Sequence, residues 1–172
     1  MDTKLILITG GAKAGKSNFA KKLAEAMGGG AVSFMATAEP LDPEMRKRIA
    51  RHRAERPASW ETLEEPLELP QALLAARHTV VLLDCLTLWV SNLLMAKRDV
   101  EAAAENLLAA HAKTSKALLV VTNEVGLGIV PDNPLARAYR ELLGTANQRL
   151  AEKADKVYLL VSGIPVQIKG AL

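Results

Sequence analysis

The sequence predicts a three-layer α/β domain built on a mainly parallel sheet of at least five strands. Short apolar runs rich in β-branched residues alternate with longer helical segments along the chain. Strands that are apolar throughout, rather than at every second residue, are typical of a sheet covered on both faces. The length suits one domain, which we expect to span 1–172. A hydrophobic fraction of 49% argues against a disordered chain.

Five elements are expected in the first half of the chain. Asp42 and Pro43 are typical of a helix start, as N-cap and first helical residue, and Pro57 should end that helix near Arg56. Three prolines then interrupt the pattern, leaving room for one short extended piece around Trp60. In order, we expect a strand over 4–9, a helix over 16–27, a strand over 31–37, a helix over 43–56 and an irregular crossing segment over 57–70.

The second half repeats the alternation of strand and helix. Asn133 and Pro134 again mark a helix start. A loop that contains Gly126, Gly128 and Pro131 precedes it. In order, we expect a strand over 79–84, helices over 86–96 and 100–116, a strand over 117–122, a helix from 133 to 153 and a last strand over 157–161.

A glycine-rich loop joins the first strand to the first helix, and its spacing matches the phosphate-binding P-loop in full. The glycines allow backbone N–H groups to surround a phosphate, and the helix start favours anions. Lys16 is expected to reach the β- and γ-phosphates, and Ser17 to ligate Mg²⁺. A ligand-free glycine turn is the alternative, which the strand–loop–helix context disfavours. The predicted loop consists of Gly10, Gly11, Ala12, Lys13, Ala14, Gly15, Lys16 and Ser17. We therefore predict a P-loop NTPase fold.

Two acidic residues follow apolar strands and are candidates for the same site. Asp84 ends Val80–Leu83 and suits the carboxylate that helps to hold Mg²⁺ in P-loop enzymes; alternatively it caps the helix that follows. Glu124 comes just after the next strand, at the sheet edge where ligands bind. Its alternative is a solvated loop carboxylate.

The segment from Arg46 to Arg56 is the most basic stretch of the chain. Arg48, His52 and Arg56 are four residues apart and share one helix face. This pattern indicates either a solvated basic face or a histidine nucleophile aimed at a nucleotide phosphate. Neighbouring cations favour the neutral imidazole, whose ring nitrogen can attack phosphorus. His78 and His111 lack such a setting, and we expect them at the surface.

Charge and composition exclude several other classes of protein. The net charge of +3 is small, and aromatic residues make up only 3%, which argues against a platform for nucleic acid. The single cysteine excludes an internal disulfide and a cysteine-based zinc site. No stretch approaches the about 20 apolar residues of a membrane span, so we expect a cytoplasmic protein.

A linked set of motifs resembles the bifunctional adenosylcobinamide kinase / adenosylcobinamide-phosphate guanylyltransferase of cobalamin biosynthesis over nearly the whole chain. The phosphate loop alone is shared by many families, whereas the set is specific. The matching segments are 8–12 leading into the P-loop, 36–38, 41–45, 48–49, 52–53, 56–57, Trp60, 84–87, 91–94, 122–126, 128–131, 147–148 and 161–164.

The resemblance implies a two-step enzyme. Such an enzyme phosphorylates the aminopropanol hydroxyl of adenosylcobinamide with ATP or GTP. It then takes GMP from GTP onto a histidine and passes it to adenosylcobinamide phosphate, giving adenosyl-GDP-cobinamide. His52 falls on the guanylylated histidine, and the family forms a trimer. The implied nucleotide contacts are residues 10–17, Ala36, Thr37, Ala38, Arg53, Ala54, Glu55, Arg56, Glu64 and Asp84.

One departure from the family concerns Lys13 and Ala14, which stand where Arg-Ser is more frequent. It casts little doubt on phosphate binding, because the loop binds mainly through backbone N–H groups. A P-loop kinase of another small metabolite, with a structural His52, remains an alternative. A non-catalytic nucleotide-dependent switch is a second one.

Overall fold

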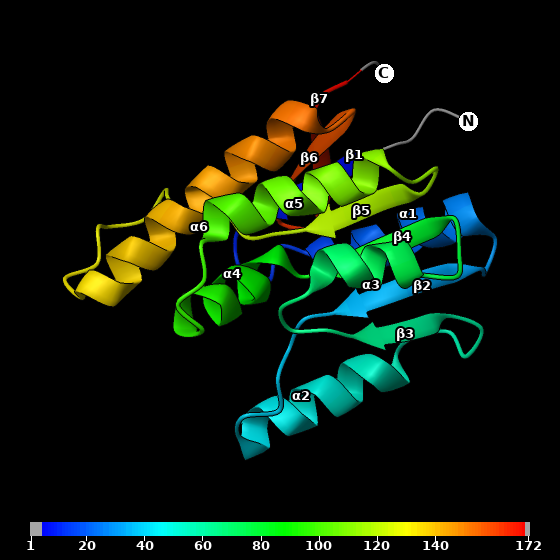
Figure 1. Ribbon diagram of the computed structural model, residues 1–172, viewed down its shortest axis with the longest axis horizontal. Helices are drawn as coiled ribbons and strands as arrows, with labels where there is room; N and C mark the ends of the chain where they lie inside the picture. The colour runs from blue at the N-terminus through cyan, green and yellow to red at the C-terminus, as the bar shows by residue number, and fades with distance from the viewer. Residues whose placement is uncertain (1–4, 171–172) are drawn as a thin grey trace.

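The computed structural model describes residues 5–170, which form one seven-stranded sheet of order β3-β2-β4-β5-β1-β6-β7 (Figure 1). Neighbouring strands run parallel except β7, which is antiparallel to β6. The predicted mainly parallel sheet is confirmed. The strands are β1 Leu5–Gly10, β2 Val32–Ala36, β3 Glu61–Glu64, β4 Val80–Asp84, β5 Ala117–Val121, β6 Lys156–Val161 and β7 Ile164–Lys169.

Helices cover both faces of the sheet. One buried core contains Ala20 and Ala24 of α1. The other contains apolar side chains of α3, α4, α5 and α6. Strand residues contribute to both cores, which explains their continuous apolar runs. The helices are α1 Lys16–Gly28, α2 Pro43–Ala54, α3 Leu69–Ala75, α4 Leu86–Met95, α5 Val100–Ala112 and α6 Pro134–Lys153. Among residues 5–170, no helix combines the length and apolar character needed to cross a bilayer.

Helix α2 lies outside these layers, beyond the edge strand β3 (Figure 1). It begins as predicted, because the Asp42 carboxylate accepts a hydrogen bond from the N–H of Met45 at 2.7 Å and Pro43 opens the first turn. It ends at Ala54, two residues before the predicted end. The described residues of α2 are exposed or half-buried, so few apolar contacts hold this helix against the sheet.

One edge strand and one helix differ from the sequence prediction. β3 corresponds to the short extended piece expected around Trp60, within a segment that was otherwise expected to be irregular, whereas α3 was not expected. β7 follows β6, which we expected to be the last strand; the two join through Ser162 and Gly163, both at positive φ (50° and 84°). That conformation suits a two-residue hairpin turn. β3 and β7 are half-exposed or exposed, so neither shows the apolar run of a buried strand.

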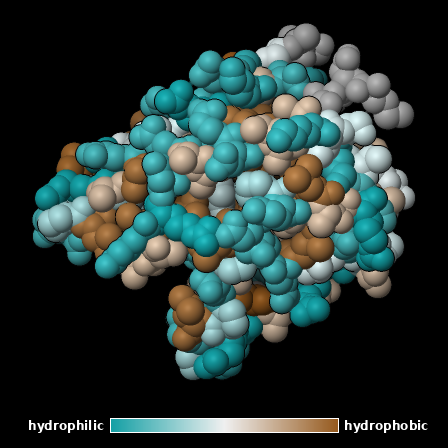
Figure 2. Space-filling model, in the orientation of Figure 1, coloured by the Kyte–Doolittle hydropathy of each residue, from teal (hydrophilic) through white to brown (hydrophobic). Residues whose placement is uncertain are grey.

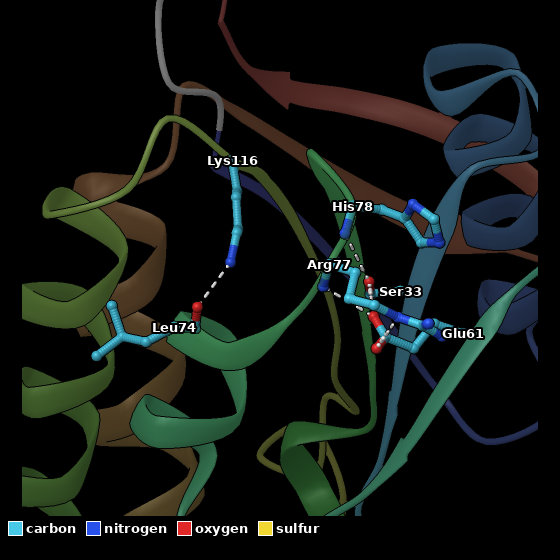
Figure 3. A network of polar contacts seen from close by, with 6 residues as sticks. All are labelled: Ser33, Glu61, Leu74, Arg77, His78 and Lys116. Carbon is cyan, nitrogen blue, oxygen red and sulfur yellow. Dashed lines mark hydrogen bonds and ion pairs between the residues drawn. The ribbon is translucent and has the colours of Figure 1, made fainter.

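Polar contacts fix the end of the sheet that lies away from the phosphate loop (Figure 3). The Glu61 carboxylate accepts hydrogen bonds from the hydroxyl of Ser33 and from the backbone N–H and Nε of Arg77. Burial acts to raise the pKa of Glu61, but these hydrogen bonds and the charge of Arg77 lower it below its usual value. Lys116 donates to the carbonyl oxygens of Leu73 and Leu74, which joins the end of α3 to the start of β5.

Candidate nucleotide and transfer site

The glycine loop connects β1 to α1 in a fixed backbone geometry. Gly15 is the N-cap of α1 at φ 92°, a conformation that glycine adopts without strain. A Cβ at Gly10 would lie 2.5 Å from the carbonyl oxygen of Leu160, so a side chain cannot be placed there. The N–H of Gly163 donates to the carbonyl oxygen of Ala14 at 3.0 Å. The loop is therefore held by the β6–β7 turn with its helix start free for an anion.

Lys16 is 7% exposed and lies across this loop, with its Nζ donating to the carbonyl oxygen of Gly11 at 2.6 Å. Burial lowers the pKa of Lys16, and the neighbouring Cys85 and Asp84 oppose that shift. Burial also raises the pKa of Cys85 to about 11, so its thiol is uncharged at neutral pH. Asp84 is thus the anion that faces the lysine.

Asp84 ends β4 and is half-buried. Its strand is not a direct neighbour of β1, because β5 lies between them. The carboxylate still acts electrostatically on both Lys16 and Arg56. The helix-cap alternative is wrong, since Cys85 occupies the N-cap of α4 and that cap has no side-chain hydrogen bond.

The buried hydroxyl of Thr37 is hydrogen-bonded to the backbone of the turn between β4 and α4, next to Asp84. Thr37 is fully buried, and its Oγ1 donates to the carbonyl oxygen of Cys85 at 2.8 Å and accepts from the N–H of Cys85 at 3.1 Å. The amide of Asn92 then donates to the carbonyl oxygens of Thr37 and Pro66. The Thr37 side chain, predicted to contact nucleotide, is thus engaged with the protein backbone.

A cavity of about 140 Å³ opens at the carboxyl ends of β2 and β4. It combines groups from the phosphate-loop helix, the sheet edge and α2. Predicted site residues supply half of its wall: Ser17, Ala36, Ala38, His52, Arg56, Glu64 and Asp84. The rest of the wall is apolar, and none of its residues was expected to contact nucleotide: Phe34, Pro40, Met45, Ile49, Cys85 and Leu88.

One face of α2 closes the cavity. Met45, Ile49 and His52 recur at helical spacing on α2 and line it, and Arg56, just beyond the end of the helix, lines it as well. The arrangement brings His52 to the same cavity as Ser17 and Asp84, as the nucleophile hypothesis requires. The side chain of Arg48, expected on the same face, lies outside the part of the structure that is described.

The predicted contacts Arg53, Ala54 and Glu55, at the end of α2, are not among the described residues that line this cavity. Arg53 forms an ion pair with Glu64 at 3.3 Å, and both side chains are exposed. Glu55 pairs with Lys21 at 3.4 Å, which connects α2 to α1. Ala54 is exposed at the end of α2. Exposed ion pairs contribute roughly 0–1 kcal/mol, so these contacts orient α2 without fixing it rigidly.

Arg56 is the cation held most firmly in the cavity wall. Its guanidinium carbon lies 3.8 Å from the centroid of the Phe34 ring, and one terminal nitrogen donates to Thr62. Its Nε is buried without a hydrogen-bond partner among the described residues. Burial lowers the pKa of Arg56, while the charges of Asp84 and Glu64 oppose this shift. A phosphate or a base oxygen in the cavity would satisfy this guanidinium.

Glu124 lies next to the phosphate loop but has a structural role. Its N–H donates to the carbonyl oxygen of Gly10 at 3.1 Å. Its carboxylate accepts from the N–H groups of Gly126 and Leu127. The half-buried carboxylate thus shapes the loop that follows β5.

The expected surface position of His111 is wrong. This residue is 7% exposed, and its Nε2 lies 3.1 Å from the carbonyl oxygen of Lys116. Burial lowers the pKa of His111, which favours the neutral ring. Four apolar residues precede His111 on α5. The burial of His111 therefore follows from its place on an apolar helix, which the residue type alone does not indicate.

The glycine loop, its lysine and the carboxylate at the tip of β4 define a P-loop nucleotide-binding protein. Two solved structures share the fold at 13% identity. The flagellar accessory protein FlaH of Methanocaldococcus jannaschii matches with a TM-score of 0.52, covering 97% of this chain and 78% of its own. The ATPase domain of G40P matches with a TM-score of 0.50, covering 90% and 68%.

Within that class, the chain belongs to the cobinamide kinase / cobinamide phosphate guanyltransferase family, whose model matches residues 6–168. It is 44% identical to the bifunctional adenosylcobalamin biosynthesis protein CobP of Pseudomonas aeruginosa, over 95% of this chain and 96% of the relative. It is 42% identical to the corresponding CobU of Salmonella typhimurium, over 96% and 99%. The family expected from the sequence motifs is confirmed.

Proposed function

We propose that this protein carries out two successive transfers in cobalamin biosynthesis and uses His52 as a covalent carrier of GMP. The membership of the cobinamide kinase and guanyltransferase family supports both activities. The observation that carries the mechanism is the shared cavity, which His52 lines together with Ser17 and Asp84. One nucleotide site then presents either its γ-phosphate to an acceptor or its α-phosphate to the histidine.

In the kinase step, the aminopropanol hydroxyl of adenosylcobinamide attacks the γ-phosphorus of ATP or GTP. The bond from that phosphorus to the bridging oxygen breaks, the nucleoside diphosphate leaves with the bonding electrons, and the hydroxyl proton is released to solvent. The glycine loop orients the phosphates through its N–H groups, and Lys16 neutralises the developing charge. In this step Lys16 exchanges its hydrogen bond to Gly11 for the phosphate oxygens.

In the guanylyl step, a neutral ring nitrogen of His52 attacks the α-phosphorus of GTP and pyrophosphate leaves. A phosphate oxygen of adenosylcobinamide phosphate then attacks the same phosphorus, and the P–N bond breaks. The products are adenosyl-GDP-cobinamide and free histidine. Covalent catalysis of this kind divides one difficult transfer into two easier ones. Arg56 is suited to hold the phosphate that changes partners.

Mg²⁺ is part of this proposal. The hydroxyl of Ser17 and the carboxylate of Asp84 line one cavity and are hard oxygen donors of the kind that Mg²⁺ prefers. Phosphate oxygens and water would supply the remaining ligands. Bound there, the ion would neutralise charge on the β- and γ-phosphates.

The residues expected to contact nucleotide divide into two groups in this proposal. Lining residues such as Ala36, Ala38 and Glu64 contact the base or ribose. Thr37 instead acts through Cys85, as a positioning residue for Asp84.

A homotrimer also belongs to the proposal; the exposed apolar side chains of the edge strand β7 support self-association. The single catalytic domain over 1–172 and the cytoplasmic location stay predictions.

The His52→Ala variant tests the division of labour between the two steps. We expect it to lose guanylyl transfer and keep most of its cobinamide kinase activity, because the kinase step needs only a positioned hydroxyl. Both rates are measured on one preparation. Arg51→Ala, an exposed change on the same helix, is the control and should keep both activities. Equal loss of both activities in His52→Ala would contradict the proposal.

A further inference from the structure

The loop between β5 and α6 carries large apolar side chains that face solvent. Ile129 is 98% exposed, Leu127 89% and Val130 62%. Leu135 at the start of α6 and Met95 at the end of α4 are 53% and 69% exposed. Figure 2 shows hydrophobic side chains gathered at this end of the molecule. We call these five residues the apolar rim. Covering such side chains removes apolar surface from water, so a ligand that packs on them is bound more tightly.

The loop backbone is anchored although its side chains are exposed. Arg140 donates to the carbonyl oxygen of Gly126, beside Leu127. Arg137 donates to the carbonyl oxygens of Pro131 at 2.9 Å and Asp132 at 2.6 Å. The apolar side chains are therefore presented by a segment fixed at both ends, as a preformed binding surface requires.

The rim is connected to the nucleotide site. Its loop begins at Glu124, which is hydrogen-bonded to Gly10 of the phosphate loop. A groove of about 240 Å³ between α4 and α6 continues the rim, with Met95, Leu135 and the polar side chains of Ser91, Asn133 and Tyr139 in its wall. The Tyr139 hydroxyl donates to the carbonyl oxygen of Thr87, three residues beyond Asp84.

We propose that the apolar rim binds the corrin ring of the cobinamide acceptor. This inference rests on the proposed function and adds the acceptor site to it. A corrin macrocycle is far too large for the 140 Å³ cavity, so the ring must lie outside while its aminopropanol arm enters. The ring carries peripheral methyl groups and amide side chains. The methyl groups match Leu127, Ile129 and Val130, and the amides match the polar groups of the groove.

The test compares Leu127→Ser and Ile129→Ser with Leu74→Ser, which changes a 50% exposed leucine on α3. Binding of adenosylcobinamide is measured by equilibrium dialysis, using the visible absorbance of the corrin, and the kinase KM is measured in parallel. We expect both rim variants to weaken binding and raise KM about tenfold or more, the loss expected for one buried apolar side chain. Phosphorylation of free 1-amino-2-propanol, which lacks the ring, should be the same in all proteins.

Two results would overturn the inference. One is corrin binding by the rim variants equal to that of Leu74→Ser. The other is a changed sedimentation coefficient with unchanged corrin binding, which would assign the rim to contact between copies of the chain. Labelling of each variant with α-labelled GTP in the absence of acceptor separates this inference from the proposed function. The rim variants should label normally, whereas absence of label in the unmodified protein would count against the histidine carrier alone.

Discussion

At the scale of single residues, Lys16 is the side chain on which both transfers depend in the proposed mechanism. Lys16 is buried beside the loop. Cys85 and Asp84 are the two described side chains that raise its pKa, and of these Asp84 is the one that is negatively charged at neutral pH. We predict that Lys16→Ala lowers kinase activity by roughly two orders of magnitude or more, since a phosphoryl transition state needs this charge. Guanylylation should fall as well, because we propose that both steps use one phosphate loop.

Steady-state kinase assays check this prediction, with circular dichroism to establish that the variant is folded. Lys22→Ala, an exposed lysine on the same helix, is the matched control and should keep its activity. Near-normal phosphorylation of cobinamide by Lys16→Ala would show that the glycine loop does not serve the kinase.

Asp84 gives a second prediction at this scale. If its carboxylate helps to hold Mg²⁺, then Asp84→Asn should require more metal, and its activity should partly recover at high Mg²⁺. An amide keeps the shape of the side chain but removes the charge that the ion prefers. Titration of the kinase rate with Mg²⁺ measures the effect, and a metal dependence identical to that of the unmodified protein would exclude Asp84 from the metal site.

At the scale of elements, the junction of β4 and α4 depends on Thr37. Removing its hydroxyl in Thr37→Val leaves the N–H and carbonyl of Cys85 buried without that partner, at a cost of about 1–3 kcal/mol. We also expect a higher Mg²⁺ requirement, because the turn positions Asp84. Thr37→Ser keeps the hydroxyl and should restore both properties.

Urea unfolding and Mg²⁺ titration of the two Thr37 variants provide the measurements. A purely structural role would lower the free energy of unfolding of Thr37→Val and leave its metal dependence unchanged. If Thr37 contacted the nucleotide directly, Thr37→Val would instead raise the KM for GTP and leave the free energy of unfolding unchanged. Either pattern would remove Thr37 from the positioning role.

The end of α5 gives a prediction about pH. Burial lowers the pKa of His111 in the folded state, whereas the unfolded chain has a pKa of about 6.5. As pH falls below that value, the unfolded chain takes up the proton first, so the stabilisation present above it is lost. His111→Gln can still donate to Lys116 but does not titrate.

The free energy of unfolding in urea is compared for the two proteins at pH 7.5 and pH 5.5. We expect the unmodified protein to lose more stability on acidification than His111→Gln. The same loss in both would show that His111 does not contribute to acid sensitivity.

The same elements show how far the sequence predicts the fold. β1, β2, β4 and β5 are buried on both faces, and their continuous apolar runs identify them. β3 and β7 are exposed edge strands; Pro165 fits only such a strand, because an edge strand has an unpaired side. α3 is a helix of 7 residues, too short for a periodic pattern.

The candidate site also has a part that the sequence predicts and a part that it does not. The phosphate loop is a continuous motif, so its residues can be predicted one by one. The apolar cavity wall joins Phe34, Met45 and Leu88 from three elements, and only tertiary packing brings them together. The burial of Thr37 likewise depends on Cys85, which is far along the chain. The sequence therefore predicts the candidate reactive groups, but it does not predict the apolar wall around them or the contact between Thr37 and Cys85.

At the scale of the whole molecule, the fold has two parts: a sheet with a well-packed core on each face, and helix α2, which makes few buried contacts with it. The sheet is covered by two buried cores, whereas α2 lies at its edge and contains no buried residue among those described. The helix that carries His52 is therefore held mainly by its cavity face and by exposed ion pairs. This arrangement suits a group that must approach one phosphate in one step and leave room for an acceptor in another.

The central claim is that His52 carries GMP, and covalent labelling tests it most directly. The protein is incubated with α-labelled GTP and Mg²⁺ without cobinamide, then digested and mapped. We predict one labelled peptide containing His52, with a bond that is labile in acid and stable in base, and no label in His52→Ala. Label on a peptide that lacks His52, or undiminished labelling of His52→Ala, would contradict the account.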